Sequence, residues 1–180
     1  YKWIRSRLKE ESNSNLFDDS TKKQNLNEFL LKDSGAEKLY GFFWRSLLDK
    51  KYKTASKILK ILDKKIQTSI NKEELKPMVI LAKANLENRL SNYSNSAKLI
   101  KKTLPIKNTH PSKRALLRLL LKNYLEEKEF LLADETAQII LKQWPKDFWV
   151  WSQRAKIAEN LGLRTKAHIY SAESYVAMHK

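Results

Sequence analysis

The sequence contains no cysteine and very little glycine or proline. Without cysteine the chain has no disulfide, no thiolate zinc ligand and no cysteine nucleophile, although this absence does not fix its compartment. Three glycines and four prolines are few for 180 residues, because sheet proteins need many turns built from these two residue types. No segment approaches the ~18 uninterrupted apolar residues of a membrane-spanning helix. These absences favour an all-α protein without a transmembrane segment.

Apolar residues recur at helical spacing in four successive pairs of segments. The pairs that this pattern predicts cover about 36–66, 73–104, 113–143 and 147–178. Two shorter helices are expected before them, at about 1–11 and 24–32, and Ser112 is expected to cap the first helix of the third pair. We therefore predict an N-terminal helical segment, 1–34, followed by a repeat region, 35–180.

Landmark residues in the last two pairs define the kind of repeat. The third pair carries Tyr124, Ala133 and Pro145, and in the fourth the matching landmarks are Trp151, Ala155, Gly162 and Ala167. Ala133 and Ala167 lie 34 residues apart, which is the period of the tetratricopeptide repeat. The prediction is an all-α, tetratricopeptide-repeat-like solenoid of four helix pairs preceded by two short helices. Such scaffolds usually hold another protein and seldom act as catalysts.

Small residues are expected where the two helices of a pair cross. Ala133 and Ala167 allow close approach in the last two pairs, and Ala55 and Ala97 are expected at the same position in the first two. Gly162 suits a left-handed residue at the end of a helix. Only the last two pairs match the repeat pattern well, since the first two lack its tryptophan and glycine.

Short motifs at both ends of the chain resemble a protease family. The segment 149–175 contains Ala-His-x-x-x-Ala-Glu at Ala167–Glu173, and Tyr40-Gly41 precedes the first repeat. With the segment 1–8, these motifs resemble the C-terminal region of bacterial periplasmic metalloproteases related to the β-barrel assembly-enhancing protease. Their H-E-x-x-H motif does not occur in this chain, which begins at Tyr1 without methionine or signal peptide and which we interpret as a piece of a longer protein.

The resemblance implies a role as well as a fold. It implies a non-catalytic, periplasmic, protein-binding domain of a metalloprotease whose zinc belongs to a catalytic domain absent from this chain. Its partners would be outer-membrane or secreted substrates, the outer-membrane assembly machinery, or its own protease domain. The alternative is a free-standing cytosolic repeat adaptor.

Neither a metal site nor a catalytic pair is predicted in the chain itself. His168 and His179 lie three helical turns apart, about 16 Å, so they cannot share an ion directly, and His110 lies far away in sequence. The neighbouring carboxylates, such as Glu126-Glu127, sit in polar stretches where nothing would raise the pKa of one partner. We expect no catalytic residue, no metal and no cofactor here.

Positive charge is abundant and unevenly distributed. The net charge is +16, and residues 35–72 carry +7 whereas residues 112–145 carry +1. One face of the helix expected at 52–66 is a lysine stripe, which we define as Lys53, Lys57, Lys60 and Lys64. We interpret the lysine stripe as a solvated face that could meet anionic headgroups. A basic nucleic-acid binder is a further alternative, but the exposed aromatic or arginine side chains that read bases are not evident.

The repeat register also predicts a partner-binding face. The first helix of each pair lines the concave side of such repeats, and the residues that fall there in the last two pairs are Arg118, Lys122, Trp149, Ser152 and Lys156. Cations beside an aromatic anchor suit an acidic or carboxylate-bearing peptide. The alternative for Trp149 is packing against Trp144 and Phe148.

Overall fold

The computed structural model describes residues 5–7, 34–107 and 109–179 of the chain. All regular structure in these ranges is helical, which confirms the all-α fold class. The helices are α3 (Ala36–Leu48), α4 (Tyr52–Gln67), α5 (Lys72–Arg89), α6 (Tyr93–Thr103), α7 (Ser112–Glu126), α8 (Phe130–Gln143), α9 (Phe148–Asn160) and α10 (Arg164–Met178). The two short helices predicted at 1–11 and 24–32 lie outside the described residues, except for residues 5–7, which are helical.

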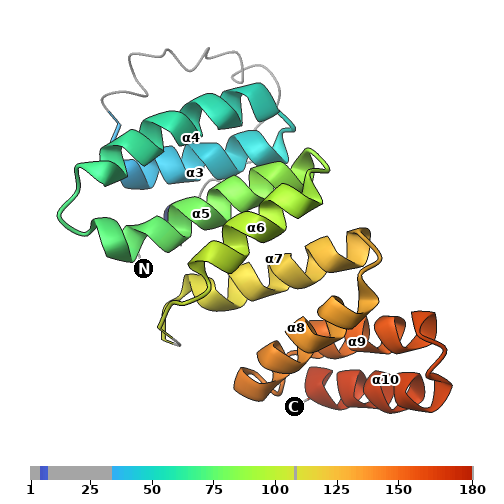
Figure 1. Cartoon of the computed structure of the whole chain (residues 1–180). Coiled ribbons are helices and arrows are strands. Elements are labelled where there is room, and N and C mark those ends of the chain that lie inside the picture. The colour runs from blue at the N-terminus through green and yellow to red at the C-terminus, as the bar shows by residue number, and fades with distance from the viewer. Residues whose placement is uncertain (1–4, 8–33, 108, 180) are drawn as a thin grey trace. The chain divides into compact units, whose positions relative to one another are not determined.

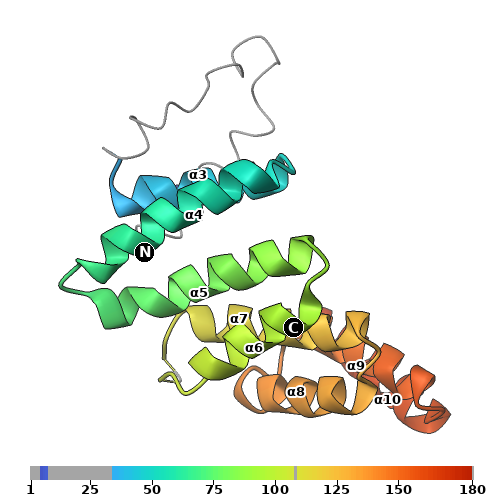
Figure 2. The same cartoon turned by 45° about the horizontal axis from the view of Figure 1, so that its top comes forward.

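Consecutive helices pack as pairs, as a tetratricopeptide-like arrangement requires. Contacts are extensive between α3 and α4, between α7 and α8, and between α9 and α10. Figures 1 and 2 show α3 beside α4 and α9 beside α10 from two directions. The observed bounds agree with the predicted pairs to within one or two residues.

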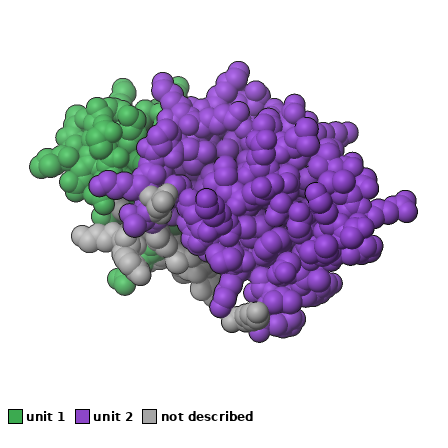
Figure 3. Space-filling model, turned by 60° about the horizontal axis from the view of Figure 1, so that its bottom comes forward, with its two compact units in different colours: residues 1–86 green, residues 87–180 purple. Residues whose placement is uncertain are grey.

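The chain divides into two compact units within α5. Residues 1–86 form the first unit and residues 87–180 the second, coloured separately in Figure 3. The expected division at residue 34 separated an N-terminal segment from the repeats, whereas the observed one falls inside the repeat region.

The same turn joins the two helices in all four pairs. One residue of each turn has a left-handed backbone, with φ of 57° at Lys50, 62° at Ser91, 59° at Lys128 and 73° at Gly162. The next amide donates to the carbonyl five residues earlier, for example Glu129 N to Tyr124 O at 2.9 Å and Leu163 N to Ala158 O at 2.8 Å. This is the Schellman pattern, which satisfies carbonyls at the end of the first helix. The prediction for Gly162 is confirmed, and the three other pairs adopt the same turn without glycine.

The turn fixes where the small residue of the second helix must lie. The buried small residue comes five positions after the left-handed one: Ala55 after Lys50, Ala133 after Lys128, and Ala167 after Gly162. In the second pair the equivalent position is Ser96, which is fully buried, so the assignment of Ala97 was wrong by one residue. A serine fits because it is nearly as small as alanine and its hydroxyl finds a hydrogen-bond partner.

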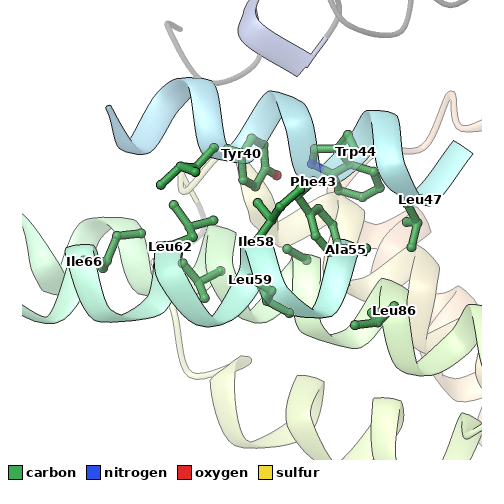
Figure 4. Packing of buried hydrophobic residues seen from close by; sticks show 13 residues of the cluster. Tyr40, Phe43, Trp44, Leu47, Ala55, Ile58, Leu59, Leu62, Ile66 and Leu86 are labelled. Carbon is green, nitrogen blue, oxygen red and sulfur yellow. The ribbon is translucent and has the colours of Figure 1, made fainter. Parts of the chain in front are cut away.

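The core of the first unit is formed by the facing sides of α3 and α4 with part of α5. Figure 4 shows Phe43 and Leu47 of α3 directed towards α4, and Tyr40 and Trp44 belong to the same buried cluster. The buried residues of α4 are those that its amphipathic pattern predicts, namely Ala55, Ile58, Leu59, Leu62 and Ile66. The four lysines of the lysine stripe are exposed, which confirms the two-sided character of this helix.

A buried polar chain lies within the core of the second unit. The Asn88 side-chain amide donates to Asn123 Oδ1 at 2.7 Å, and the Asn123 amide donates to Ser96 Oγ at 2.7 Å. Asn123 and Ser96 are fully buried, and Asn88 is nearly so. These bonds connect the end of α5 with α6 and α7 and fix the register between them, because a shift would leave buried polar groups unpaired.

The start of α7 differs from the prediction. Ser112 is the first helical residue rather than the cap, and Pro111 occupies the cap position. The Ser112 amide instead donates to Nδ1 of His110 at 3.1 Å, so an imidazole satisfies this helix end.

Candidate partner-binding site

Two arginines of α7 converge on one aspartate that precedes α9. Arg114 and Arg118 are one helical turn apart, and Asp147 is the last residue of the loop between α8 and α9. The Arg114 Nε and Nη2 atoms donate to Asp147 Oδ2 at 3.0 and 2.9 Å. Arg118 binds the same carboxylate through two donors on one edge of its guanidinium group, Nε to Oδ2 at 2.9 Å and Nη2 to Oδ1. The arrangement ties the third helix pair to the fourth.

Asp147 also caps α9. Its side chain is fully buried and accepts the Val150 amide at 3.3 Å, the bond expected of a helix cap. Burial alone would raise the pKa of Asp147, but hydrogen bonds from Arg118 and Arg114, together with the charge of Arg118, outweigh it. The pKa therefore lies below its ordinary value, and the carboxylate stays ionised as the fixed anion of the cluster.

Tryptophan rings flank both guanidinium groups. The Arg118 guanidinium carbon lies 5.1 Å from the centre of a Trp149 ring, and that of Arg114 lies 5.8 Å from a Trp144 ring. The arginine side chains keep exposed fractions of 44% for Arg114 and 35% for Arg118. They are thus held in place on one side and open to solvent on the other. Two guanidiniums against one carboxylate leave one positive charge in excess.

The residues predicted for this face have different environments. Arg118 and Trp149 lie together, although Arg118 is already paired with Asp147. Lys122, one turn further along α7, is half-buried and makes no ion pair in the described ranges. Lys156 is exposed on α9. The Ser152 hydroxyl donates to the Trp149 carbonyl at 2.8 Å and accepts from Gln153 Nε2 at 3.2 Å, so it already has both a donor and an acceptor partner within α9.

Arg114, Trp144 and Asp147 were not predicted as part of this site. The spacing of Arg114 and Arg118 and an aspartate just before a helix were visible signals in the sequence. Their meeting depends on the fold, because Asp147 lies 29 residues beyond Arg118. The Arg118 guanidinium lies over a ring of Trp149. The alternative suggested by the sequence was that Trp149 packs against Trp144 and Phe148.

A second arginine–aromatic cluster lies on α9 and α10. Arg154 donates to Asp134 Oδ1 at 2.7 Å, and its guanidinium carbon lies 4.3 Å from the Tyr170 ring. Trp151 packs beside Tyr170 and donates to the Pro145 carbonyl at 2.8 Å. An open groove of about 740 Å³ between α8 and α9 borders this cluster, with Ile139 and Lys142 among its lining residues. In this second cluster the charge of Arg154 is balanced by that of Asp134. The cluster therefore offers less selectivity for an anion than the Arg114–Arg118 cluster.

Two further results concern metal binding and membrane spanning in the described part of the chain. The described ranges hold no group of three or more histidine, aspartate or glutamate side chains placed to bind a metal ion. None of the helices described for this chain combines the length and apolar character needed to cross a bilayer.

Comparison with family models, with curated proteins and with solved structures gives no match to this chain.

Proposed function

We propose that this chain is a non-catalytic protein-binding module that captures carboxylate-bearing peptide segments on α7 and α9. The observation that carries the proposal is the cluster of Arg114 and Arg118, both half-open to solvent, positioned by Asp147 and flanked by Trp144 and Trp149. Arginine and tryptophan are the residue types that contribute most energy at protein interfaces. Holding them in place before binding reduces the entropy lost when a partner docks.

The charge of the cluster favours an acidic partner. Asp147 neutralises one of the two guanidinium charges, and Lys122 adds another cation along the same helix. The planar fork of arginine suits a carboxylate because it offers several N–H donors in a fixed geometry. An apolar side chain beside the carboxylate would pack against the half-buried Trp149.

The cellular setting of this binding is proposed from the resemblance. In that setting the chain recognises substrates or partners for a periplasmic zinc metalloprotease, whose catalytic domain supplies the zinc. The acidic segment would belong to an outer-membrane protein, to the assembly machinery or to the protease domain itself. A free-standing adaptor would use the same surface with a different partner.

The test uses lysines of the face rather than its arginines. Replacing Arg118 would also break the Asp147 pair, so lost binding would be confounded with lost stability. We expect the double variant Lys122→Glu, Lys156→Glu to weaken binding of an acidic peptide by about tenfold, roughly 0.7 kcal/mol for each charge reversal. The probe is a fluorescein-labelled Glu-Phe-Glu-Phe peptide with a free C-terminal carboxylate, measured by fluorescence anisotropy.

The matched control is Lys98→Glu, Lys166→Glu, which makes the same charge change at exposed positions of the same unit. If both double variants lose affinity equally, net charge rather than this face determines binding. If the wild-type chain does not bind the acidic peptide more tightly than a Gln-Phe-Gln-Phe peptide with an amidated end, the proposal is wrong.

A further inference from the structure

We propose that the lysine stripe of α4 is an electrostatic docking face for an anionic phospholipid surface. This inference goes beyond the proposed peptide binding, because it concerns the first unit and a different class of partner. It rests on the placement of the four lysines, on the absence of ion pairs to them within the described ranges, and on further lysines between α4 and α5.

The four lysines form a single exposed row. Lys53, Lys57, Lys60 and Lys64 are all exposed, and their spacing keeps them on one side of α4 over about 16 Å. The opposite side of the helix is buried in the core of the unit. The stripe therefore presents its charges outwards from a rigid support, and the helix has no free apolar face that could insert into a bilayer.

Among the residues that the structure describes, no carboxylate neutralises the charge of the stripe. None of the four lysines forms an ion pair within the described ranges, and α4 contains a single acidic residue, Asp63. Asp63 instead pairs with Lys83 of α5, with 2.8 Å between its Oδ2 and Lys83 Nζ. The one carboxylate of the helix is thus already occupied by a cation from its neighbour.

Further lysines lie between α4 and α5. A small hollow of about 100 Å³ between α4 and α5 is lined by Lys72, Lys76 and Lys83 as well as Asp63. Lys76 approaches Glu73 at 3.9 Å, with both side chains largely exposed, so this pair is weak. Three lysines against one aspartate give the lining of this hollow a positive charge in the same unit as the stripe.

The chemistry of the face favours a membrane surface over nucleic acid. The helix that carries the row, α4, contains no arginine, and its one aromatic residue is Tyr52 at the first position. Proteins that bind single strands add aromatic platforms for the bases, and base reading relies largely on arginine. A lipid headgroup layer needs only a row of point charges, and each lysine near an anionic surface contributes roughly a fivefold gain in partitioning.

The experiment is co-sedimentation of the full 180-residue chain with vesicles. The vesicles are phosphatidylcholine alone or phosphatidylcholine with about 30% phosphatidylglycerol, each at about 0.05 and 0.15 M salt, because screening shortens the reach of the charges. We expect binding to the anionic vesicles only, weakening as salt rises. Changing Lys53, Lys57, Lys60 and Lys64 to Gln should weaken it at least tenfold.

The control changes four exposed lysines of the second unit to Gln: Lys98, Lys102, Lys142 and Lys166. Both variants lower the net charge by the same amount, so a loss confined to the stripe variant supports the docking face. Equal losses in both variants, equal binding to neutral vesicles, or no vesicle binding at low salt would overturn the proposal. It would also be overturned if the stripe variant lost binding to a labelled oligouridine at 0.15 M salt, a concentration near physiological, while keeping its vesicle binding.

Discussion

At the scale of single residues, we expect Asp147 to contribute more to the stability of the fold than a loop residue usually does. Its carboxylate accepts hydrogen bonds from two arginines and from the Val150 amide in the first turn of α9. A fully buried anion with these donors stabilises the fold only while all of them are present, because each donor offsets the cost of removing the charge from water.

Asp147→Asn should lower the free energy of unfolding by about 2–3 kcal/mol. This is less than the 3–5 kcal/mol of a fully buried pair, because both arginines remain partly solvated. Urea denaturation followed by circular dichroism measures the change. The control is Asp134→Asn, which breaks the more exposed pair with Arg154 and should cost under about 1 kcal/mol. Equal losses would contradict the central role of Asp147.

The same pair predicts a dependence on acid. The folded-state pKa of Asp147 lies below the ordinary value of 3.8, so its stabilisation is present above that pH and is lost as the pH falls through the folded-state pKa. We expect the stability difference between wild type and Asp147→Asn to be constant near neutral pH and to narrow below pH 3.8. A difference that does not narrow at all as the pH falls well below 3.8 would show that the charge is not responsible.

Asn123 is the second residue whose change should be costly. Asn123→Ala removes two buried hydrogen bonds and leaves the Asn88 amide without its Asn123 acceptor. The expected loss is about 2–3 kcal/mol in a urea denaturation experiment. Asn160→Ala removes a hydrogen bond from an exposed asparagine on α9 and should stay within about 0.5 kcal/mol. Similar losses for the two variants would mean that the buried chain of amides does not hold the register.

At the scale of helices, the repeated turn is the common element of the four pairs. Lys50, Ser91 and Lys128 hold left-handed backbones that side chains disfavour, whereas Gly162 holds one without steric cost. The hydrogen bonds of the turn and the packing of the two helices maintain this conformation in three pairs against a local preference.

Lys128→Gly should therefore stabilise the chain by about 0.5–1 kcal/mol, because glycine relieves the left-handed strain. The control Lys156→Gly replaces an exposed lysine inside α9 and should destabilise by about 1 kcal/mol, since glycine is unfavourable in helix interiors. Thermal melts of both variants give the comparison. A loss of stability in Lys128→Gly would mean that the lysine side chain contributes more than its backbone strain costs.

The sequence predicted the helices well because their apolar period is strong, and α4 is the clearest example. It predicted one of the four left-handed turns, since only Gly162 is a residue type that favours such a conformation. It assigned Ala97 instead of Ser96 to the small-residue position, because serine is not the usual small residue of the repeat. At the binding face, the repeat register indicated Arg118 and Trp149. It could not indicate that Asp147 would be buried beneath them, because that follows from contacts between residues far apart in the chain.

At the scale of the whole chain, the two compact units raise the question of how far they unfold together. In repeat proteins, stability is close to a sum of unit stabilities and nearest-neighbour terms, so a local loss need not spread through the array. Residues 87–180 contain both the Asp147 cluster and the buried polar chain of Asn88, Asn123 and Ser96. Residues 1–86 have their own apolar core around Phe43 and Ile58.

We therefore expect Asp147→Asn to accelerate amide exchange in α7–α10 and to leave α3 and α4 nearly unchanged. Hydrogen–deuterium exchange resolved by peptide measures this directly, because exchange reports the free energy of each local opening. A change of about 2 kcal/mol corresponds to roughly a thirtyfold faster exchange in the affected helices. The matched change in the first unit is Ile58→Ala, which removes a fully buried side chain of α4 and should show the opposite distribution. If either variant accelerates exchange equally in both units, the chain unfolds as one cooperative body and the two units are not energetically separate.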